Sequence, residues 1–140
     1  MLLVETYVDA SAIEGVGVFA AQPVAKGTQV WRFEPTLDRA LRAGEVQALP
    51  PAARAFLDRY AYVHPDDRTI YMLDGDHGRF MNHADDPNTD YAQGYAGFAV
   101  RDIAAGEELT CDYGQFYSSH EFLPSLTEKF GSAKPKDASK

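Results

Sequence analysis

The amino-acid sequence predicts a small, mainly β domain of irregular topology that carries one helical insert. Short runs of apolar and polar residues, separated by turn residues such as Gly and Pro, fill the first third and the second half of the chain. Between them, from about residue 37 to 62, apolar residues recur at helical spacing. At 140 residues and 15.4 kDa, the chain is long enough to bury one core. We therefore expect one domain over 1–131, followed by a disordered tail over 132–140.

Six segments have the composition and flanking turn residues of short strands. They are 2–8, 15–20, 28–33, 69–73, 97–100 and 108–113. Gly15-Val16-Gly17, read alone, predicts a tight turn that needs positive φ at glycine. Asp74–Gly78 resembles the opening of a calcium-binding loop, but it lacks the third oxygen ligand and the glutamate at the twelfth position. We expect a polar turn there and no metal site.

The helical insert is expected to hold two helices. Pro50-Pro51 can open the second of them, because proline is favoured in the first turn of a helix. The apolar residues at helical spacing are Leu37, Leu41, Val46, Leu49, Ala53, Phe56, Leu57 and Tyr60. Near the end of the chain, 115–130 predicts a short helix or a packed extended segment, with Pro124 limiting a continuous helix.

The charge and cysteine content exclude several classes of function. A net charge of −8 repels phosphate backbones, and no basic patch offsets it, so direct nucleic-acid binding is not expected. The single cysteine, Cys111, excludes an intramolecular disulfide and a multi-cysteine zinc cluster. No apolar run approaches the length of a membrane span or a signal segment. We therefore expect a cytoplasmic protein that does not bind membranes. A nuclear location and a homodimer are left open.

Two strings of residues carry most of the functional information. The first, Arg79-Phe80-Met81-Asn82-His83, places an amide beside an imidazole and is followed by Pro87-Asn88. The second, Glu107 to Gly114, is a strand-like run that ends on a tyrosine next to a glycine. Each string alone has an ordinary structural explanation, as a polar turn or a core aromatic residue. Together they indicate a pocket wall with a phenol placed in it.

These strings, in this order, resemble the SET domain of protein lysine methyltransferases. The resemblance covers about Thr6 to Gly114, and the joint occurrence of its elements is far more specific than any one of them. The matching elements are Gly15-x-Gly17, Tyr71-x-x-Asp74, Arg79-Phe80-x-Asn82-His83, Pro87-Asn88 and Glu108-Leu109-Thr110-x-Asp112-Tyr113-Gly114. The resemblance implies a β-clip-like fold of short strands with a C-terminal pseudoknot, in which the segment 108–113 meets Asn82-His83.

The resemblance also implies that S-adenosyl-L-methionine is the cofactor. In the family, the backbone of the first glycine loop and the asparagine-histidine segment bind it. The residues expected to bind the cofactor are Glu14, Gly15, Val16, Gly17, Arg79, Asn82 and His83. Asn82 and the adjacent main chain are expected to bind the adenine edge and the polar groups of the cofactor. Arg79 is expected to orient this loop by pairing with Asp85 or Asp86.

Tyr113 occupies the position of the catalytic phenol of the family. A lysine amine must lose a proton, from a reference pKa near ~10.4, before it attacks a methyl group in line with the leaving sulfur. The Tyr113 hydroxyl is expected to orient this amine. Tyr71, Tyr91 and Cys111 are expected to line the substrate channel. Because the thiol of Cys111 is smaller than the Phe or Tyr that many relatives place there, the number of methyl groups transferred stays open.

Two departures from the family pattern change the expected architecture. Ala84, Asp85 and Thr89 stand where many relatives carry cysteine or its neighbours, so a zinc site that closes the lysine channel is not expected. Phe116, Tyr117 and Phe122 are expected either to cover the cofactor and channel or to be ordinary core residues. His77, His83, Asp85 and Asp86 lack a recognisable metal-ligand spacing, which favours a hydrogen-bonded loop.

The leading hypothesis is an S-adenosylmethionine-dependent methyltransferase that modifies a lysine of a basic protein or peptide. The acidic surface favours such a partner. The alternative is a catalytically inactive SET-like module that binds basic peptides, although the intact Tyr113 and Asn82-His83 argue against it. A related β fold that acts on a small molecule is the third alternative.

Overall fold

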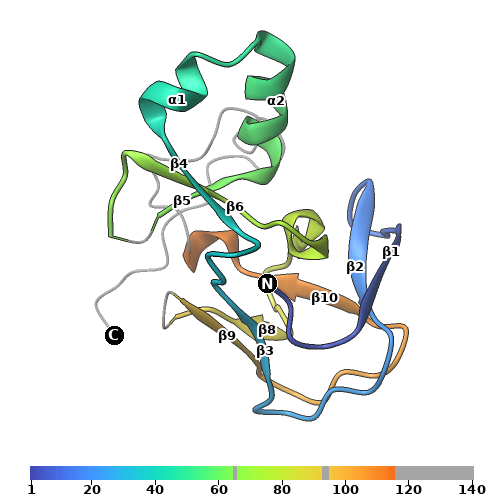
Figure 1. Cartoon of the computed structure of the whole chain (residues 1–140). Coiled ribbons are helices and arrows are strands. Elements are labelled where there is room, and N and C mark those ends of the chain that lie inside the picture. Colours follow the sequence, from blue (N-terminus) through green and yellow to red (C-terminus); the bar gives the residue numbers. More distant parts are fainter. Residues whose placement is uncertain (65, 93–94, 116–140) are drawn as a thin grey trace. The chain divides into compact units, whose positions relative to one another are not determined.

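The computed structural model describes residues 1–64, 66–92 and 95–115 (Figure 1). The chain divides into two compact units. The first unit combines Met1–Arg39 with Asp74–Asp112, and the second combines Ala40–Leu73 with the residues from Tyr113 onward. No helix among the described residues is long and apolar enough to cross a membrane.

Short strands dominate the described residues, and few helices interrupt them (Figure 1). In chain order, the elements are β1 (Thr6–Ala10), β2 (Val16–Ala20), β3 (Gln29–Arg32), β4 (Arg39–Arg42), α1 (Ala43–Gln47), α2 (Pro51–Tyr60), β5 (Tyr62–Val63), β6 (Ile70–Leu73), the 3-10 helix η1 (His77–Phe80), β7 (Asn82–His83), β8 (Thr89–Asp90), β9 (Ala96–Ala99), β10 (Glu108–Cys111) and the 3-10 helix η2 (Tyr113–Gln115). The mainly β class expected from the sequence is confirmed.

The first unit contains a four-stranded sheet with the order β1-β2-β10-β7. β1 and β2 form an antiparallel hairpin in which Val8 pairs with Val18, and β10 pairs antiparallel with the other edge of β2. β10 also pairs in parallel with β7, so that Thr110 faces Asn82 and Cys111 faces His83. This parallel pairing confirms that the two motif strings lie side by side.

A second sheet of the first unit has the order β3-β9-β8, and apolar side chains from both sheets and from the segment after β9 are buried in this unit. Val18, Val30, Ile103 and Leu109 are each at most 1% exposed. Burying an aliphatic side chain of this size contributes about 1.5–3 kcal/mol. The four-stranded sheet that carries the motifs is therefore anchored in a packed core.

The second unit contains the sheet β4-β6-β5 and the helices α1 and α2. Pro51 is the first residue of α2, as its place after Pro50 predicted. The helices and sheet share a small core of Val46, Leu57 and Ala61, against which Leu41, Tyr71 and Leu73 pack. The expected helical insert is confirmed for 43–47 and 51–60.

Three details of the expected secondary structure are wrong. The first strand is Thr6–Ala10 rather than 2–8. The insert begins with the strand β4, because the spacing of four residues between Leu37 and Leu41 fits a strand as well as a helix, and β4 pairs with β6. The last strand ends at Cys111, and Tyr113 instead begins η2. The predicted segment 116–130, with Phe116, Tyr117 and Phe122, and the tail 132–140 lie outside the described residues.

Candidate functional site

The loop between β1 and β2 is held by its own backbone and by Ser11. The Ser11 amide donates to the Gly15 carbonyl at 2.9 Å, and the Ser11 hydroxyl oxygen accepts from the amides of Ile13 at 2.9 Å and Glu14 at 3.3 Å. Gly15 has φ of +49°, in the left-handed region that glycine adopts without a Cβ penalty. The turn expected at Gly15 is confirmed.

The Asn82 side chain joins this loop to β10. Its Nδ2 donates to the carbonyl oxygens of Glu14 at 3.1 Å and Val16 at 3.0 Å, and to Glu108 Oε1 at 2.9 Å. Asn82 is 7% exposed. Its Oδ1 has no hydrogen-bond partner within the part of the chain that the structure describes. The N–H groups of the side chain are therefore used in fixing the loop, and Oδ1 is the atom that can accept from a ligand.

Gly17 is required by the close approach of Glu108. A Cβ at position 17 would overlap the Oε1 atom of Glu108 and would lie 2.7 Å from its Cδ and 3.3 Å from Asn82 Nδ2. The carboxylate also accepts from the Ser11 hydroxyl, which lies 2.9 Å from both oxygens. The sequence motif includes Glu108, but no role had been expected for it or for Ser11.

His83 lies between two carboxylates. Its Nε2 is 3.1 Å from Asp85 Oδ1, and its Nδ1 is 3.8 Å from Asp112 Oδ1. The Asp85 side chain is fully exposed, so its pairing with His83 contributes little to stability. The main chain of His83 is fixed by pairing with Cys111, and the following Ala84 amide donates to the Cys111 carbonyl at 3.0 Å.

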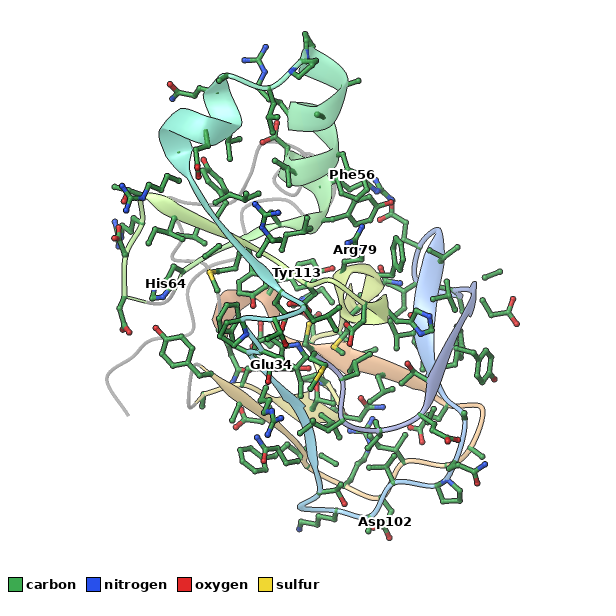
Figure 2. The ribbon with its side chains drawn as sticks, viewed as in Figure 1. Glu34, Phe56, His64, Arg79, Asp102 and Tyr113 are labelled. Atoms are coloured by element: carbon green, nitrogen blue, oxygen red, sulfur yellow. The ribbon has the colours of Figure 1, made fainter. Side chains whose placement is uncertain are left out.

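Arg79 lies on η1 of the first unit, where Figure 2 labels it. Its Nε donates to the carbonyl oxygen of Asp74 at 3.0 Å. Asp85, one of its two expected partners, contacts His83 instead. Asp76 caps η1 by accepting from the Gly78 amide at 3.0 Å, which confirms the polar turn expected at 74–78. Arg79 therefore contacts the start of the turn that precedes Asn82-His83.

Tyr91 and Cys111 lie together inside the first unit. The Tyr91 hydroxyl donates to Met81 Sδ at 3.4 Å, and its ring packs edge-on against Trp31 at 5.6 Å between centroids. Cys111 Sγ lies 3.8 Å from the Asn82 carbonyl oxygen. Burial raises the pKa of Tyr91 and of Cys111 well above the ordinary values, so that both side chains stay neutral at physiological pH.

Asn88 has a structural role that the sequence motif alone did not specify. It is 1% exposed. Its Nδ2 donates to the Glu108 carbonyl at 2.8 Å, and its Oδ1 accepts from the Thr110 amide at 2.9 Å. The Asn88 side chain thus pairs with the main chain of β10 as a neighbouring strand would. In the sequence, its place in the Pro87-Asn88 motif was the feature that could have pointed to this role.

Two expected site residues belong to the second unit. Tyr113, labelled in Figure 2, begins η2 and follows Asp112 directly in the chain. Tyr71 lies on β6, where it pairs with Val63 and packs against the core of that unit. The roles of Tyr113 in catalysis and of Tyr71, Tyr91 and Cys111 in a substrate channel stay predictions.

No group of three or more His, Cys, Asp or Glu side chains is arranged to hold a metal ion within 1–64, 66–92 and 95–115. The site of the first unit is instead a hydrogen-bonded junction of the β1–β2 loop, β7 and β10. In this junction, Gly17 stands where the Glu108 carboxylate approaches the backbone closely, and Asn82 Oδ1 is a hydrogen-bond acceptor.

Solved structures resemble the chain in fold. It matches Chaetomium thermophilum Polycomb Repressive Complex 2 bound to GSK126 with 25% identity and a TM-score of 0.60, covering 90% of this chain and 17% of that chain. The same complex in an autoinhibited conformation bound to S-adenosylmethionine matches with 24% identity and a TM-score of 0.60, covering 90% and 16%. The chain spans about one-sixth of the length of these relatives.

One shorter solved structure is matched over nearly its whole length. A candidate histone methyltransferase of Plasmodium falciparum has 19% identity and a TM-score of 0.54, and the match covers 80% of this chain and 95% of that chain. Comparison with curated protein sequences gives no match. The profile of the SET domain matches residues 15–114, which include the β1–β2 loop end, Asn82-His83 and Tyr113. The chain belongs to the SET domain family.

Proposed function

We propose that the protein transfers methyl groups from S-adenosyl-L-methionine to a lysine side chain of a protein substrate. The observation that carries this proposal is the junction at Asn82, whose Nδ2 joins the Glu14 and Val16 carbonyls to Glu108 on β10. Membership of the SET domain family supports it. So do a structural relative bound to S-adenosylmethionine and another described as a candidate histone methyltransferase.

The residues of the junction suit the proposed cofactor. Gly15 lets the backbone turn towards a ligand without a Cβ penalty, and Asn82 Oδ1 is an acceptor without a partner among the described residues. The amino group of an adenine or of an amino acid is a donor that such an oxygen accepts. Glu14 to Gly17, Arg79, Asn82 and His83 would hold the cofactor, which supplies a methyl group activated by a sulfonium centre.

The chain's own residues would then orient the lysine amine. Family membership implies that Tyr113 acts on the reacting atoms, and its hydroxyl would fix the neutral amine by a hydrogen bond. Release of the proton needs no strong base, since desolvation lowers the lysine pKa. The buried thiol of Cys111 stays neutral because burial raises its pKa, so it would contribute space rather than chemistry.

The substrate we propose is a basic, lysine-containing protein or peptide. The net charge of −8 favours encounter with a cationic segment. Cytoplasmic localisation stays a prediction, and a homodimer stays open.

The test of this function combines binding and transfer. Calorimetry with S-adenosylmethionine measures cofactor binding, and labelled methyl transfer into a host proteome, followed by mass spectrometry, identifies the modified residue. Tyr113→Phe should lower transfer by about 10²-fold or more while cofactor affinity stays within about threefold. Tyr7→Phe, at an exposed ring stacked on Phe19, is the matched control and should leave transfer unchanged.

Two outcomes would contradict the proposal. A wild-type protein that binds no S-adenosylmethionine is not this enzyme. Cofactor-independent binding of a basic peptide with no methyl incorporation would favour the inactive binding module instead.

A further inference from the structure

Glu108 lies at the point where three segments of the first unit meet. Its carboxylate accepts from the Ser11 hydroxyl at the start of the β1–β2 loop, and from Asn82 Nδ2 on β7. It also passes over Gly17 so closely that no Cβ fits there. One carboxylate thus contacts both ends of the segment 11–17 and the strand beside it.

We propose that Glu108 is a positioning residue that holds the segment 11–17 in the conformation that binds the cofactor. This inference rests on the proposed function, because it assigns the reason for the geometry of the same site. Among the residues that the structure describes, Glu108 contacts the segment only at Ser11 and Gly17, and it also binds Asn82 on β7, so it acts through these residues.

The Ser11 hydroxyl shows how the carboxylate fixes one end of the loop. A serine hydroxyl has one donor and two acceptor positions. Ser11 uses the donor on Glu108 and accepts from the amides of Ile13 and Glu14. Because Glu108 takes the only hydroxyl hydrogen, the oxygen lone pairs are directed towards the two amides. Removing the carboxylate leaves the hydroxyl free to rotate and loosens that end.

Asn82 shows how the carboxylate fixes the other end. Its Nδ2 has two hydrogens and three acceptors, which are the carbonyl oxygens of Glu14 and Val16 and Glu108 Oε1. The carboxylate orients the amide so that nitrogen faces the loop and Oδ1 faces away from it. Without Glu108, the amide can turn over, and the Glu14 and Val16 carbonyls lose their donor.

The Asn82 side chain must bind the loop because β10 separates from β2 at this point. Glu108 and Leu109 of β10 pair with Phe19 and Val18 of β2, and the next two residues, Thr110 and Cys111, pair with β7. Val16 therefore has no strand partner from β10, and Asn82 Nδ2 takes its carbonyl instead. Where two strands separate, the backbone groups of the loop between them have no strand to pair with. Side chains must then supply their hydrogen bonds.

Three variants test the proposal: Glu108→Ala, Glu108→Gln and Ser11→Ala. Glu108→Ala should raise the dissociation constant and KM for S-adenosylmethionine by about tenfold or more, the range for losing hydrogen bonds to a charged group. Saturating kcat should change by less than about threefold, because the reacting atoms are not contacted. Glu108→Gln should stay within about threefold of wild type, since its amide oxygen can still accept from both the Ser11 hydroxyl and Asn82 Nδ2.

Hydrogen exchange of the cofactor-free protein gives a readout that does not depend on activity. Amides of 12–17 should exchange faster in Glu108→Ala and Ser11→Ala, with the rest of the sheet unchanged. Glu107→Gln is the matched control, because within the described part of the chain its side chain accepts only from the Ala104 amide in the preceding turn. Ser11→Ala carries the test if Glu108→Ala fails to fold.

The outcomes separate this inference from the proposed function. If wild type binds S-adenosylmethionine and the Ala variants bind it equally well, or lose kcat without a change in KM, the positioning role is wrong and the enzyme assignment stands. If wild type binds no cofactor, both are overturned, whatever the exchange rates show.

Discussion

The ring of Tyr91 lies directly against the backbone of Gly97. A Cβ on Gly97 would overlap Cε1 of the ring and would lie 2.8 Å from Cζ and 2.9 Å from Cδ1. Tyr91 is 4% exposed, and its hydroxyl contacts Met81 Sδ, so the ring has little freedom to retreat. β9 must therefore carry glycine at this point.

Gly97→Ala should destabilise the protein by about 1–3 kcal/mol, the usual cost of overpacking a core. Chemical denaturation followed by fluorescence of Trp31, which packs on Tyr91, would measure the loss. Gly44→Ala is the control, because a Cβ there meets no atom within 4 Å and alanine favours the helix α1. Equal stability of the two variants would contradict the packing argument.

Asn88→Ala should cost about 2–4 kcal/mol in the free energy of unfolding. The substitution removes the hydrogen bonds to the partly buried Glu108 carbonyl and the buried Thr110 amide. Urea denaturation would measure the change. Asp86→Ala, at an exposed position in the same loop, should stay within about 0.5 kcal/mol of wild type. A loss of less than about 0.5 kcal/mol for Asn88→Ala would show that the Asn88 side chain does not stabilise the fold.

Asp74 should make stability fall as pH rises. Burial raises the pKa of Asp74 to about 6, with the nearby Asp38 and Asp76 adding to the effect, and the N-terminal ammonium opposes it. Between the unfolded value near ~3.9 and about 6, the folded state binds more protons than the unfolded state. The stabilising effect of protonation is therefore complete below the unfolded pKa and lost above the folded one.

Asp74→Asn should raise stability by about 1–3 kcal/mol at pH 7 and flatten the slope between pH 4 and 6. Thermal unfolding over this pH range would show both effects. Asp86→Asn, at an exposed aspartate, should leave the slope unchanged. A variant that unfolds earlier than wild type at pH 7 would mean that the Asp74 carboxylate stabilises the fold.

Cys111 should react slowly with thiol reagents in the native protein. Burial raises the pKa of this thiol far above its ordinary range, with nearby Asp112 and Asp74 adding to the effect, and the thiolate is the reactive species. Its modification by a disulfide reagent should be at least about 10²-fold slower than in the denatured chain, since it needs an opening of the structure. Comparable rates in both states would show that the thiol is accessible.

The sequence predicted most of the fold because its strands are short, regular runs with clear turn residues between them. Gly15 and Pro51 were placed correctly from local conformational preference alone. The strand β4 was missed because Leu37 and Leu41 have a spacing that both a helix and a strand can use. The end of β10 before Tyr113 was missed because nothing local in Cys111-Asp112-Tyr113 marks it.

The sequence named the residues of the junction at Asn82 but not the contacts among them. Cofactor binding by the Asn82 amide stays a prediction. Its N–H groups bind the Glu14 and Val16 carbonyls and Glu108, contacts that no motif specified. Ser11 had no motif that drew attention to it, since it contacts Glu108 only when the hairpin and β10 come together.

The sequence by itself determined which chemical groups this protein has and their order along the chain, and that was enough to indicate the SET domain family. Only the tertiary structure decided which of these groups face one another. The parallel pairing of β7 with β10 places Asn82 beside Thr110, and the fit of Glu108 over Gly17 depends on the register of β2 with β10. A register shift of one residue would turn every side chain to the opposite face, so contacts across strands follow from the assembled sheet rather than from local sequence.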